Sequence, residues 1–278
     1  MTSAVERAAV AAPLRESAAR PGVVRRGPHW WTAAGTVLRC ELARARVARI
    51  PLLLVAAFQS IGILLLLRGV VDVHRPSSSG DLRVESVVAG ATVLVVAFVA
   101  LNLLAQRLGA LRANGALDRY AVLPIAPSAV VLGTAAAFAV FTLPGAVVTG
   151  IIGCGLFHLH ATHLWVLVLV LPLAGASLAG IGALIGLLAP RAELATVLGQ
   201  LGMSLVIFIG IIPSGRLPEV VRALRAAVPA AYAVDALADA LRPHIAWGSV
   251  TADLAVCAGV AVVSLALGGW AFRRAVRR

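Results

Sequence analysis

Five stretches of this 278-residue sequence run for 18 residues or more without Asp, Glu, Lys or Arg. A helix that spans a bilayer needs about 20 mostly apolar residues. The stretch from Tyr120 to Pro190 has 71 residues, too long for one span, and Gly and three His residues interrupt it between Cys154 and His163. The sequence therefore predicts an all-α polytopic membrane protein with six transmembrane helices, at about 51–71, 87–106, 129–153, 164–188, 194–212 and 252–271.

The composition excludes a soluble globular domain. Hydrophobic residues make up 60% of the chain and charged residues only 13%. A soluble domain of this length needs more charge to cover its surface, so the excess apolar residues are expected to face lipid. The three Cys residues have no paired spacing and are interpreted as small apolar fillers. The three His residues of the 154–163 interruption do not share one helical face, so we expect no metal site there.

The basic residues are unevenly distributed between the two predicted sides of the membrane. With a cytoplasmic N-terminus, the inside segments hold 17 Arg and the outside segments, 68–86 and 213–249, hold seven. This positive-inside pattern predicts that both termini are cytoplasmic in a multi-pass protein of the bacterial inner (plasma) membrane. The net charge of +12 then indicates contact with anionic lipid rather than nucleic acid.

All 24 basic residues are Arg, which is typical of a high-GC bacterium. A phosphate-binding P-loop needs a Lys that reaches the β- and γ-phosphates. We therefore expect that this chain carries no ATPase site and binds no cofactor of its own, and that any ATP is bound by a partner subunit.

The two ends of the chain differ from the spans. Residues 1–28 predict a disordered cytoplasmic tail, and 274–278 a short basic C-terminus in the cytoplasm. Between the tail and the first span, 29–49 combines apolar residues at helical spacing with Arg and two Trp, which predicts a helix lying in the membrane interface. An ordinary basic flank is the alternative.

Two loops are too structured to be simple connections. Segment 106–128 is expected to form a short helix on the inner face of the membrane that presents one side to a soluble partner. Segment 213–249 lies outside and reads as two short helices, Val220–Val228 and Tyr232–Leu241, separated at Pro229. Such helices can dip part-way into the bilayer where protein surrounds them.

Three features resemble the ABC-2 family of ABC transporter permeases, which includes drug-type exporters. The first is the basic amphipathic helix directly before the first span. The second is a loop in which Arg112, Gly115 and Leu117 precede Leu123-Pro124 and a new span. The third is the stretch 228–237, which looks like the family's Pro-x-x-Tyr segment before the last span. Asn114 departs from the pattern, because the family often has an acidic residue there.

The resemblance covers roughly residues 29–273. It implies a permease that works with two ABC ATPase subunits and with a second copy or a homologous permease. It also implies export of a compound, which the apolar spans suggest is amphipathic or lipophilic. The loop at 106–128 would then be the element coupled to the ATPase, through Arg112, Gly115, Leu117, Arg119, Tyr120 and Pro124.

Polar side chains inside the predicted spans are candidates for the substrate path, because each is costly in lipid and should face protein or a cavity. They are Gln59, Asn102, Gln106, Thr142, Thr149, Gln200 and Ser204. Of these, Gln59, Asn102, Gln200 and Ser204 are assigned to the path. The alternative for each is an interhelical hydrogen bond. The pair Gly182 and Gly186 forms a GxxxG pattern, interpreted as helix packing, with a dimer interface as the alternative.

Two other functions remain as alternatives. A secondary transporter would normally place ionisable residues at mid-membrane, and the predicted spans have none, although Pro144 and Pro172 could break helices. A non-transport membrane protein such as an enzyme would need a catalytic motif, and neither HExxH nor GxSxG occurs.

Overall fold

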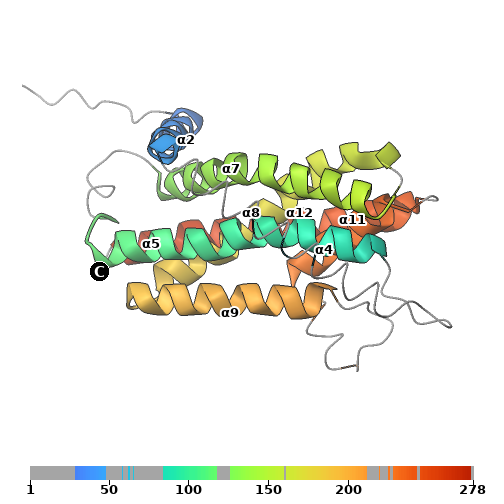
Figure 1. Cartoon of the computed structure of the whole chain (residues 1–278). Coiled ribbons are helices and arrows are strands. Elements are labelled where there is room, and N and C mark those ends of the chain that lie inside the picture. The colour runs from blue at the N-terminus through green and yellow to red at the C-terminus, as the bar shows by residue number, and fades with distance from the viewer. Residues whose placement is uncertain are drawn as a thin grey trace, which may run out of the picture.

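A computed structural model of the chain describes residues 29–47, 84–117, 126–159, 161–211, 228–242 and 245–276, with isolated residues 58, 62, 65, 219 and 225. The described segments are helical and contain no strand (Figure 1). In chain order they are α2 (Trp30–Val47), α4 (Val84–Ala97), the π-helix η1 (Phe98–Leu103), α5 (Leu104–Ala113), α7 (Pro127–Leu156), the 3-10 helix η2 (Ala161–Val166), α8 (Leu167–Leu188), α9 (Ala192–Ile211), α11 (Pro229–Ala240) and α12 (Trp247–Val276).

Four helices in the described part are long and apolar enough to cross a membrane. They are Val84–Ala113, Ser128–Leu156, Leu164–Leu188 and Trp247–Ala275. These overlap four of the predicted spans, so an all-α multi-pass membrane protein is confirmed. The expectation of a separate short helix from 106 is wrong for 106–113, because these residues continue the helix Val84–Ala113. The predicted span at 194–212 corresponds to α9, which is not among these four. The predicted first span, 51–71, lies outside the described residues except for three positions. The tail at 1–28 and residues 277–278 lie wholly outside them.

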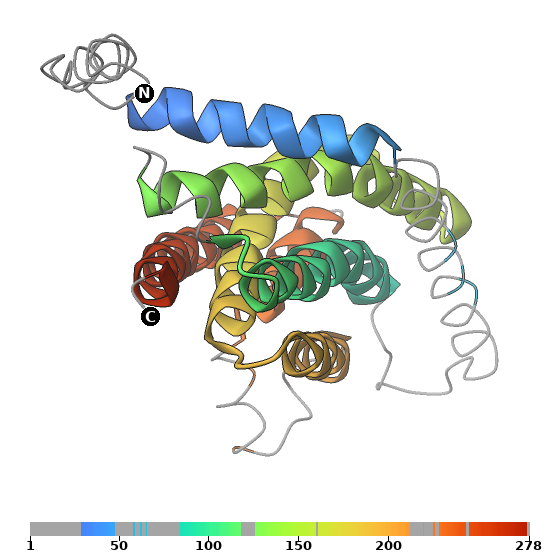
Figure 2. The same cartoon turned by 90° about the vertical axis from the view of Figure 1, so that its left-hand side faces the viewer.

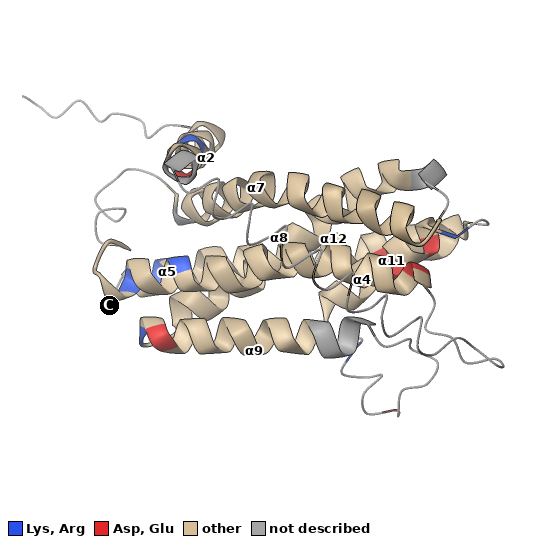
Figure 3. Ribbon diagram, in the orientation of Figure 1, with Lys and Arg blue, Asp and Glu red and all other residues tan. Residues whose placement is uncertain are grey.

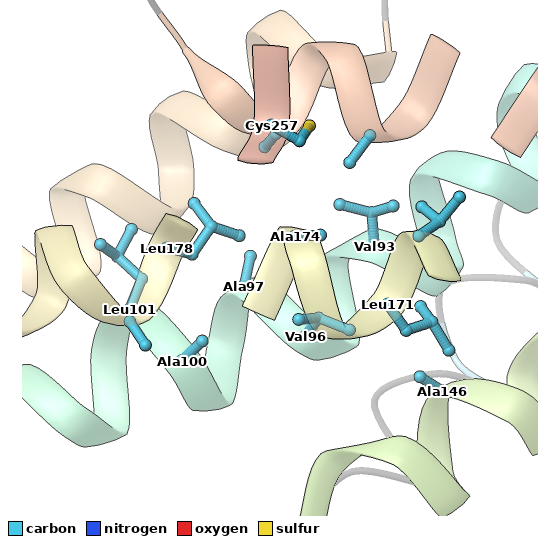
Figure 4. Close-up of a cluster of buried hydrophobic side chains, with 14 of the residues drawn as sticks. Val93, Val96, Ala97, Ala100, Leu101, Ala146, Leu171, Ala174, Leu178 and Cys257 are labelled. Carbon is cyan, nitrogen blue, oxygen red and sulfur yellow. The ribbon is translucent and has the colours of Figure 1, made fainter. Parts of the chain in front are cut away.

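The continuous helix formed by α4, η1 and α5 occupies the centre of the bundle. In its most apolar window 89% of the residues are buried, compared with 22% for α12 at the periphery. Helix α8 passes obliquely beside it, with α5 on one side and α12 on the other (Figure 2). In Figure 4, Ala174 and Leu178 of α8 lie among side chains of α4, η1 and α12, and Leu171 lies near Ala146 of α7.

Helix α8 packs closely against the central helix. A Cβ atom on Gly182 would lie 2.6 Å from the carbonyl oxygen of Ala100, and one on Gly186 would lie 2.5 Å from that of Ala105. Only glycine lets the two backbones approach this far. The interpretation of the GxxxG pair as helix packing is therefore confirmed, and the packing lies within one chain.

The buried Cys154 and Cys257 agree with the interpretation of the cysteines as apolar fillers. That interpretation is wrong for Cys40, which is exposed on α2. Helical periodicity correctly places the α2 segment in a helix, but the side of the helix that Cys40 occupies is not the side that packs on the bundle.

Helix α2 lies across one end of the bundle, over the start of α7 (Figures 1 and 2). The indole Nε1 of Trp30 donates a hydrogen bond to the Ser128 hydroxyl over 3.1 Å. Arg107 of α5 forms an ion pair with Glu41, 3.3 Å apart, and Glu41 is buried. These two contacts fix α2 on the bundle at positions eleven residues apart.

The opposite end of the bundle contains α11, a short and almost wholly buried helix. The two terminal guanidinium nitrogens of Arg225, Nη1 and Nη2, donate to the carboxylate oxygens of Asp235, each over 2.8 Å. The second helix predicted between the last two spans is confirmed, but it begins at Pro229 rather than Tyr232, because proline is favoured in the first turn. The first of the two, Val220–Val228, lies mostly outside the described residues.

Candidate functional site

The central helix ends in an exposed turn at one end of the bundle. The amide of Ala116 donates to the carbonyl of Leu111 over 2.9 Å, and the amide of Gly115 donates to that of Arg112 over 3.2 Å. This pair of bonds is the Schellman motif, which requires a left-handed residue just after the helix. Gly115 supplies it with a φ of 65°. Asn114 and Gly115 are exposed, so the turn is available to a partner.

Arg112 connects the end of α5 to the corner between α8 and α9. Its Nη1 donates to the carbonyl oxygen of Leu187 over 2.6 Å and to that of Ala189 over 2.9 Å. These carbonyls belong to the C-terminal end of α8, where acceptors are otherwise unsatisfied and the helix dipole is negative. The side chain that was expected to orient the loop toward a partner thus already stabilises a contact between helices of its own chain.

Leu117, also assigned to coupling, is only 3% exposed and packs in the chain's own core. An Asp there would bury a charge inside this chain, so it would disturb folding before it disturbed docking. The remaining coupling residues, Arg119, Tyr120 and Pro124, lie outside the described residues. The structure therefore describes Arg112, Gly115 and Leu117 of the predicted set, and of these Gly115 is exposed.

Three side-chain amides form a hydrogen-bonded chain between the central helix and α9. Asn102 Nδ2 donates to Gln200 Oε1 over 3.1 Å, and Gln106 Nε2 donates to Asn102 Oδ1 over 2.9 Å. Asn102 is buried, while Gln200 is exposed. Two residues assigned to the substrate path are thus brought together, and Gln106, which was not assigned to it, joins them. The separation of Asn102 and Gln106 by four residues was the signal that could have included it.

Asn102 belongs to η1, the π-helical segment in the middle of the central helix. Such segments are rare and are frequent at functional sites. The tight approach of α9 is visible at Gly199, where an added Cβ would lie 3.0 Å from Asn102 Oδ1. Nothing in the local sequence distinguishes η1 from an ordinary apolar helix, so this feature was not predicted.

The other polar residues of the predicted spans are satisfied locally. The hydroxyl of Ser204 donates to the carbonyl of Gln200, one turn away on the same helix, over 3.0 Å. Thr142 and Thr149 likewise bond to carbonyls four residues earlier. Gln59 lies outside the described residues. Of the predicted path, the geometry unites Asn102 and Gln200, with Ser204 one turn along α9.

The described part of the chain is thus an all-helical bundle that has several helices long enough to cross a membrane, a buried amide in its central helix and an exposed turn at one end. A family model of the ABC-2 type transporter matches residues 37–241. The chain belongs to this family, and it is therefore an ABC transporter permease, a kind of subunit that normally works with ABC ATPase subunits. Comparison with curated proteins gave no significant match.

Proposed function

We propose that the chain is the permease subunit of an ATP-driven exporter that moves an amphipathic or lipophilic compound out of the cell. In this proposal two separate ATPase subunits bind the ATP, and a second permease, either another copy or a homologue, completes the complex. The chain has six spans, α2 lies in the inner membrane interface, and both termini are cytoplasmic.

The observation that carries the proposal is the continuity of the central helix. The exposed turn at Asn114–Gly115 and the amide of Asn102 lie on one helix, 12 residues apart, which is roughly 18 Å at 1.5 Å per residue. Arg112 fixes the end of this helix to the α8–α9 corner, and Asn102 contacts α9 further along. A displacement of the turn by an ATPase would therefore reach the amides through packed helices.

The distribution of charge supports the orientation. Figure 3 shows basic residues on α5 beside the C-terminus and acidic residues on α11 at the opposite end. The turn, α2 and the C-terminus lie at the basic end (Figure 1), which under the positive-inside rule is cytoplasmic. In this orientation the turn faces the side of the membrane where ATP is available.

The exposed face of α9 is an argument for the presence of a second permease subunit. Gln200 is exposed among exposed apolar neighbours, including Val197 and Leu201, which are 52% and 60% exposed. A lipid-facing amide is costly, so this face is better covered by protein or by a water-containing path. A path that combines these apolar side chains with one amide suits a compound that is itself mostly apolar with a polar group.

The proposal can be tested in proteoliposomes containing the full chain and the ATPase encoded nearest to its gene. Asn114→Trp places a bulky side chain on the exposed turn, whereas Thr251→Trp places one at an exposed site at the other end of the bundle. We expect ATP-dependent transport of a fluorescent lipophilic cation with the wild-type chain and with Thr251→Trp. With Asn114→Trp, transport and ATPase co-purification should both be lost. Transport that survives Asn114→Trp, or that proceeds without the ATPase, would contradict the proposal.

A further inference from the structure

A pocket of about 210 Å³ lies where the C-terminal ends of α5, α8 and α12 meet. One guanidinium comes from α5 and another from α12, and the rest of the lining is aliphatic. The lining residues are Arg112, Leu187, Leu188, Ala271, Arg274 and Ala275. A pocket that combines two cations with hydrocarbon walls suits a ligand with a negatively charged group attached to an apolar body.

The two arginines can offer several donors to an anion. A guanidinium carries five N–H groups, and the two bonds from Arg112 to α8 carbonyls both use Nη1. The N–H groups on Nη2 and Nε therefore remain for a ligand. Arg274 is exposed, and its guanidinium carbon lies 5.4 Å from the ring centre of Trp270. The C-termini of three helices give the pocket a negative potential. The full positive charges of the two arginines make that potential positive.

An exposed apolar stripe on α12 leads directly to this pocket. Val256, Val263, Leu267 and Trp270 are all exposed, and their spacings of seven, four and three residues place them on one face of the helix. Arg274 follows Trp270 by four residues and continues the same face. The tryptophan and arginine thus stand where an apolar surface ends and the basic end of the bundle begins, which is the usual level of lipid headgroups.

We propose that this pocket binds the phosphate of an anionic phospholipid in the inner leaflet, with the acyl chains along the α12 stripe. Arg112 and Arg274 donate to the phosphate oxygens, and Leu188, which is 50% exposed, contacts the glycerol and upper acyl carbons. The inference rests on the proposed cytoplasmic position of this end of the bundle and not on transport. The continuous apolar stripe favours a lipid over an acidic side chain of a soluble partner or free phosphate, because neither of these would use it.

Native mass spectrometry of the purified full chain, titrated with phosphatidylglycerol or phosphatidylcholine, tests this proposal. Arg274→Gln removes one pocket charge, and Arg273→Gln removes an adjacent exposed charge that does not line the pocket. We expect wild type to retain phosphatidylglycerol in preference to phosphatidylcholine. Arg274→Gln should raise the phosphatidylglycerol concentration for half occupancy about tenfold, and Arg273→Gln should leave it unchanged.

Ala275→Leu provides a second variant, because it fills the pocket and keeps both arginines. It should also weaken phosphatidylglycerol retention. The proposal is overturned if Ala275→Leu binds normally, if both arginine variants lose equal affinity, or if phosphatidylcholine binds as well. Displacement of the lipid by millimolar inorganic phosphate would assign the pocket to a free anion. Loss of the ATPase from Arg274→Gln with unchanged lipid binding would assign it to the partner. A chain that binds the lipid but never exports would contradict the proposed function alone.

Discussion

The side-chain amide of Asn102 donates to the side-chain oxygen of Gln200 over 3.1 Å and joins two helices whose residues are 98 positions apart in the chain. The bond links the π-helical middle of the central helix to the exposed face of α9. Any change in the relative position of these two helices must stretch or break this bond, so its presence reports on how they are placed.

Removing this bond should weaken the bundle by a modest and measurable amount. Hydrogen bonds between membrane helices contribute about 0.6 kcal/mol on average and up to about 1.7 kcal/mol. A double-mutant cycle of Asn102→Leu and Gln200→Leu, measured by unfolding in bicelles, should give a coupling energy of about 1 kcal/mol. Thr142→Val, whose hydroxyl bonds only to its own helix, should show no coupling to Gln200→Leu. A zero coupling between Asn102 and Gln200 would show that their bond does not contribute to stability.

Gly115 should tolerate asparagine better than alanine. Its φ of 65° lies in the left-handed region, where a non-glycine residue is strained by about 1–2 kcal/mol. Asn adopts this conformation more readily than Ala does. Gly115→Ala should therefore lower the thermal midpoint of the purified chain more than Gly115→Asn does. Equal midpoints for the two variants would mean that the turn does not hold this conformation in solution.

Leu117 should behave as a core residue. It is 3% exposed, and Leu→Ala at buried positions costs about 2–5 kcal/mol. Leu117→Ala should destabilise the purified chain in the absence of any ATPase, whereas Leu117→Met, which keeps the volume, should be nearly neutral. A Leu117→Ala chain with normal stability that nevertheless loses the ATPase would assign this side chain to docking.

Replacement by alanine should have opposite effects on stability at Gly182 of α8 and at Gly259, a glycine of α12 that has open space around it. A Cβ at Gly182 would lie within 2.7 Å of two carbonyl oxygens, whereas nothing lies within 4 Å of one at Gly259. Gly182→Ala should separate α8 from the central helix and lower stability. Gly259→Ala should be neutral or gain up to about 1 kcal/mol, because alanine is the better helix former. Thermal unfolding of both variants in the same detergent is the measurement.

Orientation can be tested by labelling with a membrane-impermeant maleimide in intact spheroplasts. In a Cys40→Ala background, Ala246→Cys before α12 should react from outside. Asn114→Cys at the turn should react only after the membrane is permeabilised. Both positions are exposed, so lack of reaction reports sidedness rather than burial. Reaction of Asn114→Cys in intact cells would place the turn outside and reverse the topology.

The spans could be predicted from sequence because they depend on one local property, the length of an uncharged apolar stretch. The same applies to the turn at Gly115, where glycine after a helical segment indicates a C-cap. The bond from Arg112 to the end of α8 could not be predicted, because it joins residues 75 and 77 positions apart and depends on how the helices pack. Burial of Leu117 was missed for the same reason.

The amide cluster was predicted in part. Polar residues in apolar spans identify Asn102 and Gln200 as unusual, and the structure shows that they meet. The sequence does not show which helices are neighbours, so it could not choose between Gln200 and Ser204 as the partner of Asn102. It also contains no signal for the π-helical segment that carries Asn102, since the other residues of Phe98–Leu103 are those of any membrane helix.

The π-helical segment makes the length of the central helix as important as its composition. Hydrogen bonds in η1 skip one residue more than in an α-helix, so the segment accommodates an additional residue. Deleting Ala100 would remove that residue and let a regular α-helix join α4 to α5, with the residues after it near their present orientation. A deletion in α5 between Gln106 and Arg112 has no such slack and would rotate everything after it by about 100°. Arg112 would then turn away from its present partners at the end of α8, although it had not been replaced. Relatives of this chain can therefore gain or lose one residue in η1 while α5 stays in register, whereas a change of length further along the helix moves its end as a whole.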